Sequence, residues 1–204
     1  MPNTSQATTP EFTLRDEWLA QATTALRVDF ATAGYQLKQE TIRVSCGFPS
    51  KATAGKCKVI GQCWDRALEG EDGIPQIYLS PVEDDPIEIL GTLVHELVHA
   101  AVGCRHGHKK PFKVAAVALG LTGKMTATTS TPQLVERLNT LSAELGPFPH
   151  SALDLTKVKK QTTRLLKVEC IDSEHQYTAR VSRKMLDTYG APICPECQAE
   201  MIEG

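Results

Sequence analysis

Aromatic residues and long apolar runs are both scarce in this chain of 204 residues, and each scarcity excludes a class of protein. Only 5% of the residues are aromatic, while 41% are hydrophobic and 23% are charged, which is ordinary globular composition. No apolar run approaches the roughly 20 residues of a membrane-spanning helix. Residues 1–11 are polar and lack the apolar core of a signal peptide. We therefore expect a cytoplasmic protein with no membrane partner and with a disordered tail at residues 1–11.

An even set of cysteines and a strong net charge are missing as well. Seven cysteines without an export signal indicate intracellular thiols or metal ligands and not a disulfide framework. The net charge of −2 excludes a general attraction to nucleic acid, so any DNA binding would need a local basic patch.

The segment His95-Glu96-Leu97-Val98-His99 has the pattern H-E-x-x-H and lies in a stretch that we predict to be helical. Asp85 suits the N-cap, Pro86 suits the first helical position, and Glu88 stands where a capping box places its acid. Gly103 is the expected stop. Apolar residues recur with helical spacing at Ile87, Leu90, Val94, Leu97, Val98 and Ala101.

Residues four apart on a helix point the same way. His95 and His99 can therefore bind one zinc ion, and Glu96 can act as the general base on a water bound to that ion.

A catalytic zinc site needs a third protein ligand. A metzincin would have Gly at position 102 and His at position 105, where this chain has Val102 and Arg105. A glutamate ligand on a following helix is excluded because residues 109–132 contain no acid. His106 and His108 remain as candidates.

Cysteine also provides a second predicted metal site. Cys194 and Cys197 have knuckle spacing, and Cys170 with His175 can complete a Cys₃His structural zinc site. There is no tight ligand spacing for Cys46, Cys57 or Cys63, and we expect core packing for each. Cys104 could in principle serve as the third ligand of the catalytic zinc ion, but we expect it to be a small buried residue at the end of the helix.

Periodicity predicts an α+β fold. The expected helices cover 13–30, 85–103, 111–119 and 131–145, and the expected strands cover 41–46, 58–64, 74–80, 165–169 and 177–182. Residues 157–184 hold eight Lys or Arg and three Asp or Glu, and this basic stretch is the candidate DNA contact. We place a tail at 1–11, a catalytic domain at 12–155 and a small β domain at 156–204.

The sequence H-E-L-V-H followed by G-H-x-x-x-F-K, with Phe112 as its aromatic residue, resembles the SprT-like zinc metallopeptidases, which include Spartan-type proteases of DNA–protein crosslinks. The resemblance covers about residues 12–120 and implies a zincin-like core, His108 as the third ligand and a C-terminal zinc ribbon. It also implies that the strand before the active helix, 74–80, is an edge strand that pairs with an extended substrate.

The predicted function is that of a monomeric zinc-dependent endopeptidase with a catalytic and a structural zinc ion. Its expected partners are a protein substrate and DNA bound through the basic C-terminal region. The alternative is a non-catalytic DNA-binding protein whose zinc sites are purely structural.

Overall fold

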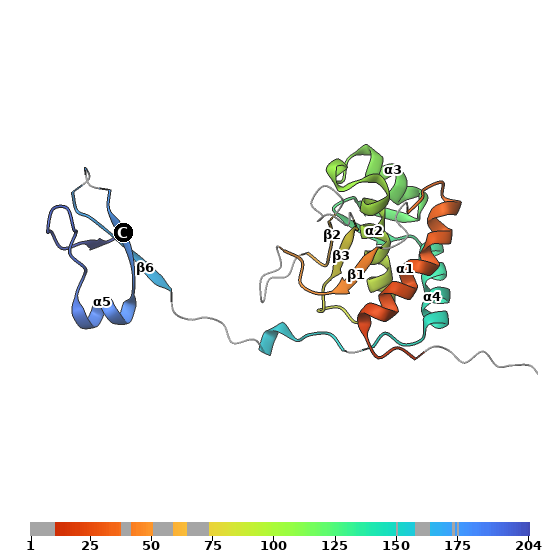
Figure 1. Ribbon diagram of the computed structural model, residues 1–204, viewed down its shortest axis with the longest axis horizontal. Coiled ribbons are helices and arrows are strands. Elements are labelled where there is room, and N and C mark those ends of the chain that lie inside the picture. The colour runs from red at the N-terminus through yellow and green to blue at the C-terminus, as the bar shows by residue number, and fades with distance from the viewer. Residues whose placement is uncertain are drawn as a thin grey trace, which may run out of the picture. The chain divides into compact units, whose positions relative to one another are not determined.

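The computed structural model describes residues 11–37, 42–50, 59–64, 74–149, 151–157, 164–172, 174 and 176–204. The chain divides into two compact units, Met1–Lys157 and Val158–Gly204. Helices and strands occur in both units, so the chain is mixed α+β (Figure 1). None of the helices in the described ranges is long and apolar enough to cross a membrane.

The first unit contains four α-helices, two short 3₁₀ helices and five strands among its described residues. In chain order they are α1 (Arg15–Thr32), β1 (Arg43–Cys46), β2 (Gly61–Trp64), β3 (Gln76–Leu79), α2 (Pro86–Val102), η1 (Cys104–His106), α3 (Lys110–Ala118), β4 (Leu121–Lys124), β5 (Ala127–Ser130), α4 (Pro132–Leu145) and η2 (Leu155–Lys157).

The three strands that precede α2 form one sheet in the order β1-β3-β2. β1 runs parallel to β3, and β2 runs antiparallel to it. The prediction that residues 74–80 form an edge strand is therefore wrong, because β3 is paired on both sides. Within the described sheet, β2 is the edge strand that contacts α2.

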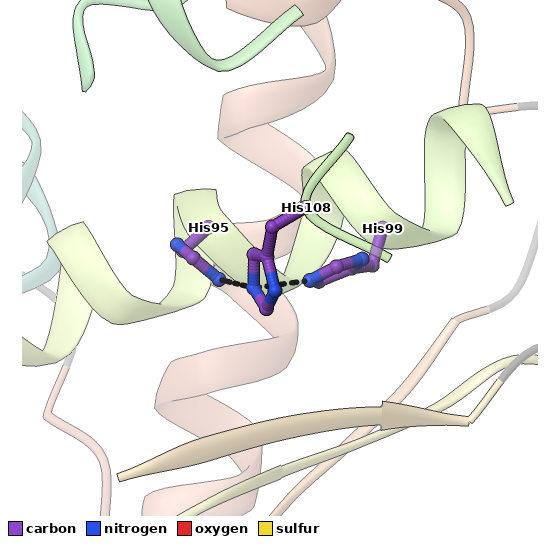
Figure 2. Close-up of side chains that lie close together, drawn as sticks. All are labelled: His95, His99 and His108. Carbon is purple, nitrogen blue, oxygen red and sulfur yellow. Dashed lines mark hydrogen bonds between the residues drawn. The ribbon is translucent and has the colours of Figure 1, made fainter. Parts of the chain in front are cut away.

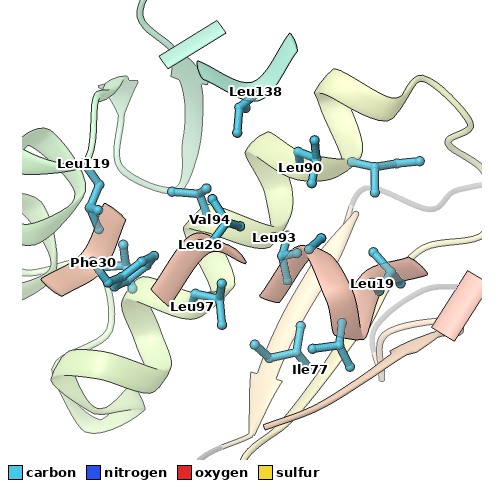
Figure 3. Packing of buried hydrophobic residues seen from close by; sticks show 14 of the residues in the cluster. Leu19, Leu26, Phe30, Ile77, Leu90, Leu93, Val94, Leu97, Leu119 and Leu138 are labelled. Carbon is cyan, nitrogen blue, oxygen red and sulfur yellow. The ribbon is translucent and has the colours of Figure 1, made fainter. Parts of the chain in front are cut away.

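The core of this unit lies between α1, α2 and the sheet (Figure 3). Apolar residues with helical spacing on α1 and α2 supply most of it, as the sequence predicts. Fully buried members are Trp18, Leu19, Leu26, Phe30, Ile77, Leu90, Leu93, Leu97 and Leu138. The helix that carries the H-E-x-x-H segment is thereby packed on one face and open on the other.

Both ends of α2 are fixed by local chemistry. The Asp85 carboxylate accepts hydrogen bonds from the backbone N–H groups of Ile87 at 2.8 Å and Glu88 at 3.1 Å, as an N-cap should. The prediction that Glu88 completes a capping box is wrong. The N–H of Asp85 donates to the carboxylate of Glu83 at 3.0 Å and not to Glu88. Gly103 ends the helix with a φ of 96°, which costs a glycine little.

Strands β4 and β5 form a hairpin that the sequence analysis does not predict, since it assigns no helix or strand to residues 120–130. The two strands pair antiparallel from Leu121 opposite Ser130 to Lys124 opposite Ala127. The hairpin closes at its base, where the N–H of Thr131 donates to the carbonyl of Gly120 at 2.9 Å. β5 contacts α2.

The second unit contains β6 (Leu165–Glu169), β7 (Thr178–Ser182), α5 (Arg183–Tyr189) and β8 (Ile202–Glu203), with the strand order β7-β6-β8. Helix α5 is not predicted from the sequence, and Ser182 caps it by accepting the N–H of Met185 at 3.2 Å. The buried core of this unit consists of Val168, Cys194 and Met201 among the residues described. So small a core suggests that a further element stabilises the fold.

Candidate metal centre

His95 and His99 lie one turn apart on the open face of α2, and His108 approaches them from the loop before α3 (Figure 2). After Gly103 the chain makes the 3₁₀ turn η1 and reverses at Gly107, whose φ is 49°. Because the chain reverses here, the imidazole of His108 lies over helix α2. The three rings thus converge from two segments of the chain.

The ring of Phe112 packs against all three imidazoles. Its ring centroid lies 4.8 Å from that of His95, 4.4 Å from that of His99 and 4.9 Å from that of His108. Phe112 is fully buried in the core, so α3 anchors the imidazoles as well as the loop that carries His108.

Two of the three distances between the ring nitrogens fit a tetrahedral zinc ion. His108 Nε2 lies 3.2 Å from both His95 Nε2 and His99 Nε2, and one ligand atom from each of the three residues lies within 4.8 Å of the others. Zinc–nitrogen bonds of about 2.0–2.1 Å in a tetrahedron hold ligand nitrogens about 3.4 Å apart. The His₃ group can therefore hold a metal ion and leave a fourth position for another ligand.

The other candidate third ligands lie outside this group. The ring of His106 accepts a hydrogen bond from Arg105 Nε at 3.4 Å, and Cys104 Sγ donates to the carbonyl of Cys63 at 3.3 Å. Neither residue belongs to the two groups of potential metal ligands found among the described residues.

Burial prepares the histidines for a metal. Loss of hydration, together with the neighbouring imidazoles His99 and His108, lowers the pKa of His95 to about 3. Loss of hydration also lowers the pKa of His108. Neutral imidazole is the form that binds metal, so these two rings are in the required form at pH 7.

Glu96 lines the same groove as the three histidines and is 6% exposed. Burial raises the pKa of its carboxyl to about 8, although a hydrogen bond from the backbone N–H of Cys63 in β2 opposes the shift. A carboxyl with a pKa near neutrality beside a metal site is well matched to proton transfer.

β2 is shaped around this carboxyl. A methyl group on Gly61 would lie 2.6 Å from Glu96 Oε1 and 2.7 Å from Thr92 Cγ2, closer than real carbon atoms approach their neighbours. The position therefore excludes any side chain as long as Glu96 keeps its place.

A groove of about 600 Å³ runs along the open face of α2, with β2 on one side and the β4–β5 hairpin on the other. It contains all three histidines and Glu96. Sequence reasoning missed the hairpin wall, including Thr128, whose Oγ1 lies 2.8 Å from His95 Nδ1. Its signal was the run of β-branched residues after Gly123.

The cysteines Cys170, Cys194 and Cys197 form a second group. The Sγ atoms of Cys170 and Cys197 are 3.4 Å apart. Backbone N–H groups of the knuckle, first that of Cys197, lower the pKa of Cys194 to about 7, which favours the thiolate that a metal binds. The predicted fourth ligand, His175, lies outside the described residues.

The remaining cysteines take no part in either group. Cys46 and Cys63 pack against the first core, and Cys57 lies outside the described residues.

Acidic residues balance the basic C-terminal stretch. Lys167 contacts Glu169, and the guanidinium of Arg183 binds Glu203 at 3.0 Å. Residues 158–204 contain seven basic and seven acidic residues, so this unit carries no net charge from them.

Comparison of the chain with protein-family models, curated proteins and solved structures finds no match in any of the three. The functional interpretation therefore rests on the two side-chain groups and the groove.

Proposed function

We propose that this protein is a zinc-dependent endopeptidase in which His95, His99 and His108 hold the catalytic ion. The observation that carries the proposal is the position of His108 Nε2, 3.2 Å from both His95 Nε2 and His99 Nε2, in a groove that a buried carboxyl also lines. An H-E-x-x-H helix in this setting is typical of metallopeptidases.

A zinc ion held by these nitrogens would supply a Lewis acid that polarises a carbonyl group and acidifies a water molecule. In its ionised form, which the positive charge of a bound zinc ion would favour, Glu96 accepts the proton of the attacking water and returns it to the leaving amine. Cys63 holds Glu96 in place through its backbone N–H. Because Gly61 has no side chain, the carboxyl has room at this position.

The substrate is an extended polypeptide that pairs with the edge of β2. Alternate residues of an antiparallel strand turn their N–H and C=O groups towards the neighbouring strand and away from it. The carbonyl of Ile60 accepts a hydrogen bond from the N–H of Ser80, just after β3, at 2.8 Å. The backbone groups of Ile60 thus face β3, and those of Gly61 and Cys63 face away from it. The backbone N–H of Cys63 donates to Glu96, and its carbonyl accepts a hydrogen bond from Cys104. The backbone N–H and C=O of Gly61 are therefore the groups that bind the substrate.

Membership of the SprT-like class, with a zincin-like core, is part of the same proposal. Its support is the sequence from His95 to Phe112 together with the order of helix, sheet, H-E-x-x-H helix and return helix. The approach of His108 to the two helix histidines is what that class requires.

The Cys170, Cys194 and Cys197 group holds a structural zinc ion in this proposal. The small core of this unit favours a bound ion, because a metal can supply the folding free energy that so few buried side chains do not.

The alternative of a non-catalytic DNA-binding protein has weaker support. Carboxylates pair with Lys167 and Arg183, and the equal numbers of acids and bases in 158–204 leave little net attraction for phosphates. DNA binding through the basic stretch 157–184 stays a prediction, as an addition to proteolysis.

Replacement of the general base tests the function. Glu96→Gln should lower the rate of cleavage of an unfolded protein, with and without DNA, by at least about 100-fold. Zinc content by native mass spectrometry should not change, because Glu96 is not a ligand. Glu136→Gln, an exposed substitution on α4, is the control and should cleave as wild type does.

Equal rates for wild type and Glu96→Gln would contradict the mechanism. A wild-type protein that binds DNA tightly but cleaves none of these substrates would favour the alternative.

A further inference from the structure

The β4–β5 hairpin contacts the metal centre at one atom, and this contact carries an inference that rests on the proposed function. Thr128 Oγ1 lies 2.8 Å from His95 Nδ1 (the ring nitrogen that faces away from the other histidines). We propose that Thr128 is a positioning residue that holds His95 with Nδ1 protonated and Nε2 directed at the metal.

The chemistry of imidazole gives this contact its role. A neutral ring has one N–H group and one nitrogen lone pair. If His95 Nε2 binds the metal, its Nδ1 must carry the hydrogen, and a largely buried N–H needs an acceptor. The Thr128 hydroxyl oxygen is at the right distance to be that acceptor.

The fold holds Thr128 in place from two sides. In the hairpin Thr128 pairs with Gly123 on β4. The base of the hairpin is closed by the hydrogen bond from the N–H of Thr131 to the carbonyl of Gly120. Against the helix, a methyl group on Gly91 would lie only 3.0 Å from Ser130 Oγ. β5 therefore approaches α2 closely, and the glycine makes that approach tolerable.

A hydroxyl differs from the carboxylates and carbonyls that usually support metal-binding histidines. It can rotate and either accept from Nδ1–H or donate to bare Nδ1. The metal-free ring can thus take either tautomer, whereas the metal-bound ring takes one.

Zinc affinity of the full-length protein, measured by competition with a chromophoric chelator, tests the assignment. Thr128→Val keeps the shape and removes the acceptor, and it should weaken zinc binding at the His₃ group by about 10–100-fold. Thr128→Ser restores the hydroxyl and should bind within about threefold of wild type. Thr122→Val, an exposed change on β4, is the matched control and should bind as wild type does.

Nuclear magnetic resonance supplies a second readout that a general loosening of the fold would not give. In zinc-loaded wild type, the Nδ1–H proton of His95 should exchange slowly with solvent. In Thr128→Val this signal should be lost while the backbone spectrum of β4 and α2 stays unchanged.

Wild-type affinity in Thr128→Val, or a loss in Thr128→Ser as large as in Thr128→Val, would overturn the role of Thr128 and leave the proposed function intact. A wild-type His₃ group that binds no zinc would overturn both. Should Thr128→Val fail to fold, the exchange of the His95 Nδ1–H proton in zinc-loaded wild type decides: slow exchange supports the role of Thr128, and exchange as fast as that of an exposed imidazole overturns it.

Discussion

Gly61 on β2 and Glu96 on α2 lie so close together that hydrogen is the only side chain the first residue can carry. A methyl group there would come within 2.6 Å of Glu96 Oε1 and 2.9 Å of Glu96 Cγ. The edge strand β2 can therefore lie this close to the Glu96 carboxyl only because residue 61 is a glycine.

Gly61→Ala should lower peptidase activity by about 100-fold or more, because a shift of the order of 1 Å in a reacting group has that effect. Zinc content should remain that of wild type, since the histidines lie away from the added methyl group. Cleavage rate and native mass spectrometry on the same sample measure the two effects.

Gly47→Ala is the matched control, because its methyl group would meet only the Tyr78 ring, at 3.4 Å. If both alanine variants retained full activity, the close fit between β2 and Glu96 would have no part in catalysis.

The metal-free protein should lose stability as the pH rises towards 8, because Glu96 is protonated in the fold. Burial raises its pKa from 4.5 to about 8, so the folded state binds more protons than the unfolded state between these values. The free energy of unfolding contributed by Glu96 is complete below about pH 4.5 and falls by roughly 1 kcal/mol per pH unit up to pH 8.

Thermal unfolding of metal-free wild type and Glu96→Gln from pH 5 to pH 8 isolates this contribution. His95, whose pKa is lowered to about 3, has the opposite slope below pH 6.5, but it is present in both proteins and cancels. The variant should gain stability relative to wild type as the pH rises. A constant difference across this range would contradict a buried, protonated Glu96.

Replacement of the candidate ligand Cys194 should unfold the second unit and spare the first. Cys194→Ser takes away both a candidate metal ligand and one of the few buried side chains of that unit, and we expect loss of its structure as in small zinc-dependent folds. Hydrogen exchange should then be fast throughout 164–204 and unchanged in α1 and α2.

Cys46→Ser is the control for this experiment, since Cys46 belongs to the first unit and to neither ligand group. Slow exchange of β6 and β7 in Cys194→Ser would show that the second unit folds without the metal.

Local sequence signals predict much of this fold. Asp85, Pro86 and Gly103 define α2 to within a residue, because caps and stops act on their immediate neighbours. The same is true of Thr131, whose hydroxyl accepts the N–H of Leu134 and caps α4. The histidines His95 and His99 share a face for the same local reason.

Pairing between distant segments is what the sequence did not predict. In the order β1-β3-β2, β1 pairs with β3 and passes over β2, which lies between them in the sequence. Periodicity within each strand does not contain that choice of partner. The edge position was therefore assigned to the wrong strand. The contact between Thr128 and His95 was missed for the same reason, since the two residues are 33 positions apart.

The third ligand tests the central claim most directly, because His106 and His108 differ in the structure by whether their rings join His95 and His99. Zinc content by native mass spectrometry should be two ions for wild type and for His106→Ala, and one for His108→Ala. Two ions retained by His108→Ala, or one lost by His106→Ala, would contradict the His₃ centre on which the proposed hydrolysis depends.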